Sequence, residues 1–307
     1  MRQKIAIAAL ATAAVLTLSA CGGDPMSSAD EGSAAGSSDK VIVGSADFSE
    51  SQLLATIYSH ALSNAGVEVE EKLNIGSREV YLEALRDGSI NLLPEYNGSL
   101  LNELGADGEG KVDAGDPEAI QGQLEELLKP DGITVLDASP AENTDTLVVV
   151  QDVAEKHDLT EISDLEAVAG DLVLAGPAEW KSRFEGVPGL KEVYGIDFKE
   201  FKVLDAGGPL TLSALQNGQA QVGDMFSSDP AIVDNDFVAL EDDKGLFPAA
   251  NILPVISEDV ASDDVTEVLN EISAALTTES LMEMNGRIAD GDDIGAIADD
   301  WLAENGL

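Results

Sequence analysis

An internal repeat constrains the fold of this chain more than any other feature of the sequence. Residues 72–99 align with residues 202–229 at an offset of 130 positions. The matching helix positions are Leu82, Ala84, Leu85 and Gly88 in the first copy and Leu212, Ala214, Leu215 and Gly218 in the second. Each copy has the pattern of a strand, a turn, a helix that a glycine ends, and a second strand. A duplicated unit of this kind predicts two similar lobes.

Both copies of the repeat end in an aromatic residue within a polar turn. Tyr96 ends the first copy and Phe226 ends the second. Open α/β sheets bind their ligands in the loops at the carboxyl ends of strands. We therefore expect Tyr96 and Phe226 to face each other across a cleft between the two lobes.

The first part of the folded body alternates between strand and helix patterns. Residues 41–45 form a short apolar run typical of a buried strand, and the helix pattern after it begins with a capping box of Ser49 and Gln52. Strand patterns recur at 67–73 and 90–93. This alternation predicts an α/β fold with largely parallel sheets.

Two segments predict where the chain passes between the lobes. The apolar run at 144–150 can cross to the second lobe, and the run at 237–240 can cross back. Helical patterns near the C-terminus then complete the first lobe. We expect a discontinuous first lobe at 40–143 and 244–307, a second lobe at 144–243, and a hinge of two crossing strands.

The N-terminal segment has the pattern of an export signal followed by a tether. Arg2 and Lys4 precede an apolar core of signal-peptide length, which predicts a signal peptide at 1–20. Its end, Leu-Ser-Ala before Cys21, resembles the lipobox of bacterial lipoproteins, in which the cysteine becomes the lipidated first residue. The alternative is an ordinary signal peptide with a chance cysteine. Residues 21–39 are rich in small and polar residues, which is typical of a flexible tether.

The chain is strongly acidic, with 59 acidic and 16 basic residues and a formal charge of −43. Phosphate groups would be repelled, so nucleic acid is excluded as a partner. One cysteine excludes an intrachain disulfide, and two histidines leave little material for a zinc site. We expect no metal and no cofactor. The charge indicates either a well-solvated surface or attraction of a cationic ligand.

Several segments resemble one known family over essentially the whole mature body. The most specific are Pro-Glu-Tyr-x-Gly at 94–98 and Leu-Glu-Asp-Asp-Lys at 240–244, and others lie at 44–50, 162–165 and 176–180. In this order they resemble the substrate-binding lipoproteins of ABC importers for quaternary-amine osmoprotectants such as glycine betaine, choline and carnitine. The resemblance implies a two-lobed type II periplasmic-binding fold with a ligand cleft between the lobes. It also implies delivery of a small solute to separate ABC permease subunits.

The resemblance implies an aromatic cage that is incomplete in this chain. A quaternary ammonium has no N–H group, so aromatic faces must hold it, each worth about 0.5–2 kcal/mol when desolvated. The family uses four tyrosine positions: Tyr96 matches one and Phe226 stands at another, whereas Asp145 and Leu212 stand at the remaining two. Asp145 would suit a cation that still carries N–H groups, or attract a quaternary head by charge alone.

The carboxylate of a betaine needs hydrogen-bond donors, ideally an arginine fork. By resemblance Arg183 takes this role and Ser99 adds a hydroxyl, whereas Ala46 replaces the usual lysine. Glu179 stands one helical turn before Arg183 and is expected to orient it as an i,i+4 pair. The expected ligand-binding residues are Tyr96, Ser99, Asp145, Glu179, Arg183 and Phe226.

Three alternative functions compete with solute capture for an osmoprotectant importer. An enzyme is disfavoured because the sequence lacks Gly-x-Ser-x-Gly, P-loop and His-Glu-x-x-His motifs. An adhesin or scaffold lipoprotein is disfavoured by the repeat. A binding protein for another solute, such as an amino acid, a polyamine or another amine, fits the incomplete cage. We therefore expect a non-enzymatic solute-binding lipoprotein, anchored by lipid on the extracytoplasmic face of the cell membrane.

Overall fold

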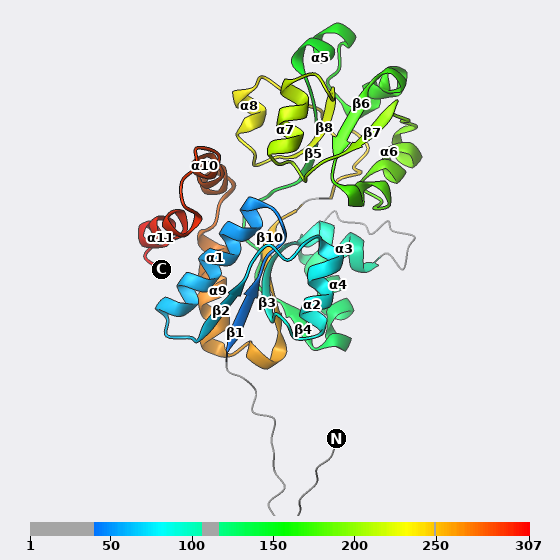
Figure 1. Ribbon diagram of the computed structural model, residues 1–307. Coiled ribbons are helices and arrows are strands. Elements are labelled where there is room, and N and C mark those ends of the chain that lie inside the picture. The colour runs from blue at the N-terminus through cyan, green and yellow to red at the C-terminus, as the bar shows by residue number, and fades with distance from the viewer. Residues whose placement is uncertain (1–39, 106–116, 249) are drawn as a thin grey trace, which may run out of the picture. The chain divides into compact units, whose positions relative to one another are not determined.

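The computed structural model describes residues 40–105, 117–248 and 250–307, and two five-stranded sheets organise these residues (Figure 1). The first sheet has the strand order β2 (Val69–Lys72), β1 (Val41–Gly44), β3 (Leu92–Tyr96), β10 (Ile252–Ser257) and β4 (Ile133–Val135). The second has the order β7 (Glu200–Val203), β6 (Val173–Gly176), β8 (Val222–Phe226), β5 (Asp145–Val149) and β9 (Val238–Ala239). We call each sheet with its helices a lobe. The expected signal peptide, tether and Cys21 lie outside the described residues.

The internal repeat is confirmed as a structural repeat. In the first lobe β2, α2 (Arg78–Arg86) and β3 follow one another, and in the second lobe β7, α7 (Pro209–Gln216) and β8 do so in the same order. Gly88 and Gly218 follow the two helices with φ angles of 76° and 67°. Only glycine adopts this left-handed conformation without strain, so each helix ends where its glycine stands.

The sheets are mixed, so the expectation of largely parallel sheets was wrong. β1 pairs in parallel with β2 and β3, but β10 runs antiparallel to β3 and β4. The second lobe repeats this pattern, with β5 antiparallel to β8 and β9. The reason is connectivity: β5 and β10 enter their sheets from the other lobe, whereas the parallel neighbours are joined by helical crossovers.

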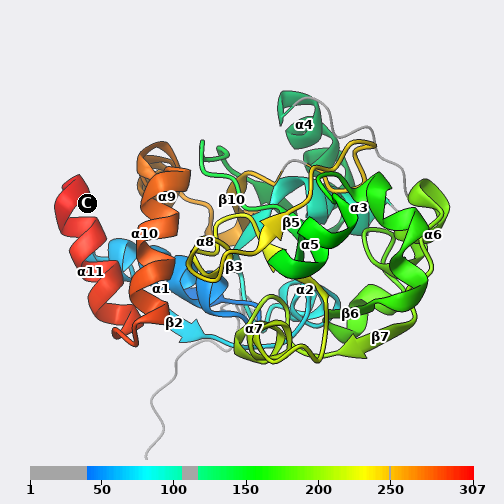
Figure 2. The ribbon, with the colours of Figure 1, turned by 90° about the horizontal axis from the view of Figure 1, so that it is seen from above.

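Helices pack against the sheet in each lobe (Figures 1 and 2). Those of the first lobe are α1 (Ser49–Asn64), α2, α3 (Asn97–Gly105), α4 (Pro117–Leu128), α9 (Asp263–Ala275), α10 (Thr278–Ala289) and α11 (Ile294–Asn305). Those of the second lobe are α5 (Gln151–His157), α6 (Val187–Tyr194), α7 and α8 (Ala231–Asp234). The C-terminal helices join the first lobe because Leu269 and Trp301 share one core with Ile57 of α1. Among the described helices, none is long and apolar enough to span a membrane.

The start of α1 differs from the sequence expectation. The helix begins at Ser49, but its N-cap is Phe48, and no side chain caps it. The neighbouring Ser51 uses its Oγ to accept a hydrogen bond of 2.9 Å from the backbone N–H of Ala46. The capping box is therefore absent, and the side chain of Phe48 takes no part in capping the helix.

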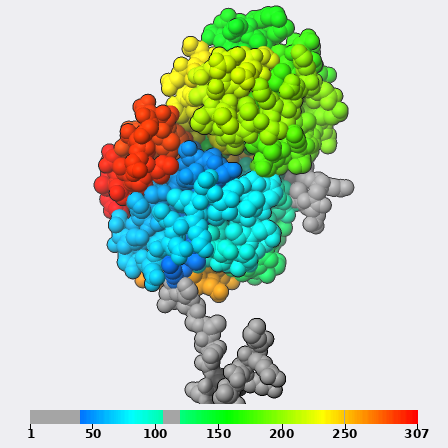
Figure 3. Space-filling model, in the orientation of Figure 1, coloured from blue at the N-terminus to red at the C-terminus, as the bar shows by residue number. Residues whose placement is uncertain are grey.

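The chain crosses between the lobes next to the second sheet. The N–H of Asn143 donates to the carbonyl of Ala250 in the first lobe, whereas the N–H of Thr144 donates to Ser227 in the second. On the way back, Leu246 packs in the core of the second lobe and Ala250 in that of the first. We propose that the chain returns to the first lobe between these two residues, slightly later than the expected boundary at residue 244. The other expected lobe limits stay a prediction. Figure 3 shows the lobes touching along a seam.

Candidate functional site

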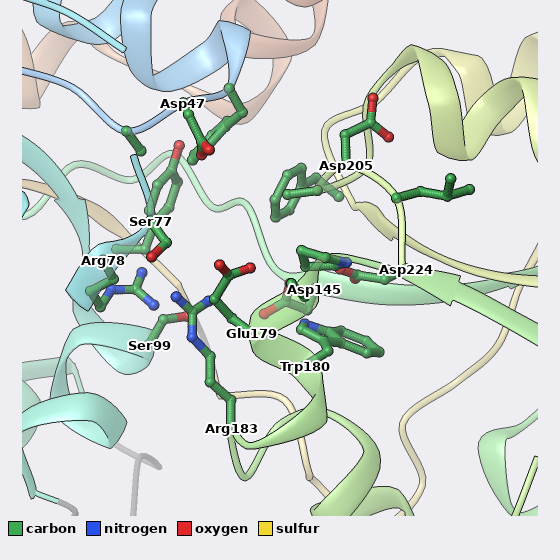
Figure 4. A pocket seen from close by; sticks show the side chains of 18 of the residues that line it. Asp47, Ser77, Arg78, Ser99, Asp145, Glu179, Trp180, Arg183, Asp205 and Asp224 are labelled. Atoms are coloured by element: carbon green, nitrogen blue, oxygen red, sulfur yellow. The ribbon is translucent and has the colours of Figure 1, made fainter. Parts of the chain in front are cut away.

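A cleft of about 250 Å³ lies where the two lobes meet, and residues of both lobes line it (Figure 4). All six residues expected from the sequence are among the lining residues: Tyr96, Ser99, Asp145, Glu179, Arg183 and Phe226. Leu212, expected at the fourth cage position, lies on α7 and is not among the described residues that line the cleft. The structure thus brings the six residues together, and their role in binding stays a prediction.

Loops at equivalent strand ends supply the lining residues. Phe48 follows β1, and Tyr96 ends β3 in the first lobe. Glu179 follows β6, and Phe226 ends β8 in the second lobe. The four strands β1, β3, β6 and β8 are the equivalent parallel strands of the two sheets. The cleft therefore lies at the carboxyl ends of parallel strands, as is usual for α/β folds.

Three aromatic rings form one continuous cluster in the cleft. The ring of Phe48 lies 6.1 Å from that of Tyr96 and 5.2 Å from that of Phe226, measured between centroids. Phe48 thus contacts both rings that were expected to face each other. Tyr96 and Phe226 line the cleft from opposite lobes, and their facing arrangement stays a prediction. Sequence reasoning missed Phe48 as a site residue, although its position directly after the first strand was a usable signal. The cluster offers aromatic faces from both lobes to a cation.

The hydroxyl of Tyr96 is already engaged inside the protein. It donates a hydrogen bond of 2.6 Å to Oε1 of Glu50, and Tyr96 is buried. Burial, together with the nearby charge of Glu50, raises the pKa of Tyr96 well above its usual value. The hydroxyl therefore stays protonated, and the ring face is the part of Tyr96 that can meet a ligand.

Glu50 is the centre of a buried polar cluster beside the cleft. Its Oε1 accepts hydrogen bonds from Tyr96 and from Asn143 Nδ2 at 2.7 Å. Its Oε2 accepts from Ser228 Oγ at 2.7 Å and from Asn285 Nδ2 at 2.6 Å. These partners come from β3, the crossing segment, the loop after β8, and α10. One carboxylate in α1 therefore links both lobes, the crossing point and a C-terminal helix.

Arg78 is a second lining residue that the sequence reasoning missed. Its Nε and Nη2 donate to the two oxygens of Glu95 at 2.9 and 3.1 Å, and Tyr81 donates to the same carboxylate at 2.6 Å. Glu95 is fully buried, and it also accepts from the N–H of Tyr96 at 2.8 Å. A glutamate inside a buried apolar strand must be hydrogen-bonded or paired with a cation, and this was the signal in the sequence. Glu95 holds the Arg78 guanidinium at the cleft wall (Figure 4).

Arg183 pairs with a different glutamate from the expected one. Its Nε and Nη2 donate to the carboxylate of Glu79 at 3.0 and 2.9 Å, across the two lobes. Burial alone would raise the pKa of Glu79, but hydrogen bonds from Arg183 and Ser77 lower it to about 2. Glu179 lies in a short 3-10 helix, Ala178–Lys181, instead of an α-helix. The N–H of Arg183 does donate to the carbonyl of Glu179 at 2.9 Å, but the Arg183 side chain pairs with Glu79 instead of the Glu179 carboxylate. Glu179 points into the cleft (Figure 4).

Two carboxyl groups lie together on the second-lobe wall of the cleft. In the register of β5 and β8, Asp145 is opposite Phe226 and Asp224 is opposite Leu147, so the two aspartates are diagonal neighbours on one face. Burial, and then the charge of Glu185, raises the pKa of Asp145. Burial, and then the charge of Asp145, raises the pKa of Asp224 well above its usual value. Because burial and the charge of Asp145 both raise the pKa of Asp224, the pair favours a state in which Asp224 keeps its proton.

Comparison with known proteins matches this architecture to one family. The family model described as "Substrate binding domain of ABC-type glycine betaine transport system" (OpuAC) matches residues 39–304. The chain is 29% identical to the glycine betaine-binding protein YehZ of Escherichia coli (strain K12), over 87% of this chain and 90% of that protein. It is 27% identical to the carnitine transport binding protein OpuCC of Listeria monocytogenes, with 88% of each chain covered.

Solved structures show the same fold. The crystal structure of a glycine betaine/carnitine/choline ABC transporter protein superimposes with a TM-score of 0.68 at 24% identity, covering 87% of this chain and 98% of that one. The two-lobed α/β fold expected from the sequence is therefore confirmed. The family has a substrate-binding role that is not enzymatic, so the enzyme alternative is excluded. Because the family model covers most of its length, the chain belongs to the OpuAC family of substrate-binding domains of ABC-type glycine betaine transport systems.

Proposed function

We propose that this chain captures a small zwitterionic or cationic osmoprotectant of the glycine betaine or carnitine type and delivers it to an ABC permease. The observation that carries this proposal is the division of the cleft into two chemically different parts. Arg78, Ser99 and Arg183 lie on one side of the cleft and Asp145 and Asp224 on the other (Figure 4), and aromatic rings complete its lining. A zwitterion needs both parts at once. The names of the two relatives, which refer to glycine betaine and carnitine, support the same class of cargo.

The aromatic cluster is the proposed site for the cationic group. Phe48, Tyr96 and Phe226 offer ring faces that attract a desolvated cation, each by about 0.5–2 kcal/mol. Asp145, which pairs with Phe226 in the register of β5 and β8, adds a carboxyl group beside this ring. The cage is thus assembled from Phe48 and the two rings found by resemblance, with Asp145 in place of a further ring.

The opposite part of the cleft is the proposed site for a carboxylate. Arg78 lines it with a guanidinium that Glu95 keeps in place. Ser99 lines it from the first turn of α3, where helix N–H groups favour an anion. Arg183 completes this part once its fork is shared between Glu79 and the cargo.

Binding is coupled to closure because the proposed contacts come from both lobes. Phe48 and Arg78 belong to the first lobe, whereas Phe226 and Arg183 belong to the second. A solute that contacts all of them at once favours the closed arrangement. Closed protein would then be the form that docks on the permease. We propose further that lipid on Cys21 anchors the protein on the extracytoplasmic face of the membrane.

Titration calorimetry and thermal unfolding with glycine betaine, carnitine and choline test the proposal. Binding to the native state raises the apparent melting temperature by mass action. We expect a saturable rise with at least one of the zwitterions and a smaller rise with choline, which lacks the carboxylate. The absence of binding by all three solutes would contradict the proposed function.

A further inference from the structure

The wall formed by β5 and β8 holds two carboxyl groups, which an aromatic cage for a quaternary ammonium does not need. Asp145 and Asp224 lie diagonally on one face and both line the cleft. Asp224 is only 1% exposed, and among the described residues its Oδ1 has no hydrogen-bond partner. A buried carboxylate oxygen without a donor is costly. This wall therefore offers a hydrogen-bond acceptor, Oδ1 of Asp224, that no donor among the described residues uses.

The charged groups around this pair do not supply the missing donor. Arg78 and Arg183 are near enough to act on Asp145 by charge, but their forks bond to Glu95 and Glu79. The charge of Glu185 also acts on both aspartates and adds to the negative potential. The region thus favours a cation, and in particular one that can donate a hydrogen bond to a carboxylate.

A fully methylated nitrogen cannot make use of these acceptors. Glycine betaine has no N–H group, so it would leave both aspartates with charge attraction alone. A cation with an N–H group could direct it at Asp145 or Asp224 while its methyl or methylene groups lie against Phe48 and Phe226. The equivalent position to Asp224 in the first copy of the repeat is Pro94, which has no such acceptor. The carboxyl pair is thus a feature of the second lobe only.

We propose that the preferred cargo is a zwitterion whose cationic group carries at least one N–H, and that Asp145 and Asp224 select for it. This inference rests on the proposed function, since it specifies the cargo of the same cleft. The recognised chemistry is a secondary or tertiary ammonium, or an amidinium, joined to a carboxylate. The aromatic cluster recognises the apolar part of the cation, the aspartates recognise its N–H, and Arg78 recognises the carboxylate.

A methylation series of glycine separates the contributions. Sarcosine, N,N-dimethylglycine and glycine betaine differ only in the number of N–H groups and methyl groups on one nitrogen. Titration calorimetry on the parent protein is expected to show N,N-dimethylglycine binding roughly tenfold to hundredfold more tightly than glycine betaine, as one charge-assisted hydrogen bond provides. Equal or tighter binding of glycine betaine overturns the inference.

Variants of the carboxyl pair identify the selecting residues. Asp145→Asn and Asp224→Asn keep the side-chain shape, and each is expected to reduce the ratio of the two affinities by about tenfold. Asp234→Asn removes an exposed charge from the same lobe and is the matched control, with an unchanged ratio expected. An unchanged ratio in both cleft variants, with intact melting transitions, would overturn the assignment. If the parent binds none of these zwitterions and no carnitine either, the proposed function fails and the inference fails with it.

Discussion

Arg183 of the second lobe and Glu79 of the first form an ion pair through two parallel hydrogen bonds of 3.0 and 2.9 Å. The pair joins the lobes at the edge of the cleft, and its arginine also lines the proposed carboxylate site. The same guanidinium can therefore hold the lobes together and hold a cargo. This double use makes the pair a sensitive point for testing closure.

A double-mutant cycle tests the coupling between these two residues. Arg183→Ala and Glu79→Gln are each expected to weaken binding of a zwitterion by about 1 kcal/mol, since Glu79 is partly exposed and the pair is screened by solvent. The double variant is expected to lose no more binding affinity than the single variant that loses more. Glu83→Gln, on the same helix but paired with Arg86 within the first lobe, is the control. Additive losses in calorimetry would show that the two residues act separately.

Phe48 is expected to contribute to affinity through its ring face. Phe48→Leu keeps an apolar side chain but removes the π-system that contacts Tyr96 and Phe226. We expect the affinity for the cargo to fall by about 0.5–2 kcal/mol, with little change in melting temperature. Phe237→Leu, in the second lobe and outside the cleft lining, serves as the control. A Phe48→Leu protein that binds as tightly as the parent would contradict the assignment.

Glu50 is expected to stabilise the folded protein rather than to bind cargo. Glu50→Gln replaces one acceptor oxygen by an NH₂ group. Either the bonds from Tyr96 and Asn143 or those from Ser228 and Asn285 can then no longer be accepted as they are. The free energy of unfolding should fall by about 1–3 kcal/mol, the cost of leaving buried polar groups unpaired. Urea unfolding measures this loss. Glu155→Gln, at an exposed position on α5, should unfold like the parent protein.

Asp224 should make the protein less stable as the pH rises. Its pKa is raised in the folded state, so the folded protein keeps a proton that the unfolded chain releases above about pH 4. The stabilisation by this proton is present at low pH and is lost as the pH rises through the folded-state pKa. Asp224→Asn removes this dependence, so the gain in the free energy of unfolding should be larger at pH 8 than at pH 4. A gain that is equal at pH 4 and pH 8 would contradict this explanation.

Lipid attachment through Cys21 predicts a clear change in cell fractionation. The wild-type protein should sediment with the membrane, and Cys21→Ala should appear in the soluble extracytoplasmic fraction. Immunoblotting of both fractions measures the distribution. A Cys21→Ala protein that remains with the membrane would show that the anchor lies elsewhere.

The lobes could be predicted from the sequence because their signals are local. Gly88 and Gly218 mark equivalent helix ends, and the aromatic residues Tyr96 and Phe226 mark equivalent strand ends. Such signals depend only on backbone conformation and on residues a few positions apart. The same locality explains why the lining residues chosen by resemblance do meet in one cleft.

The pairings inside the cleft could not be predicted because they depend on how the lobes meet. Arg183 had a glutamate nearby in the sequence, Glu179, but binds Glu79, which is 104 positions away. Phe48 contacts Phe226 only because the loops after β1 and β8 come together in space. The direction of β5 and β10 likewise follows from the path between lobes and not from their own residues.

The bonds of Glu50 also set a condition on the order of folding. Asn285, which donates to its Oε2, stands 235 positions further along the chain. A chain made from its N-terminus therefore contains α1 long before the last partner of this carboxylate exists. The hydrophobic core around α1 also waits for late residues, because it needs Leu269 and Trp301 from the C-terminal helices. The first lobe therefore begins to be made before the second lobe but is completed after it. A chain that ends before Asn285 should lack a stable first lobe, although its second lobe is complete.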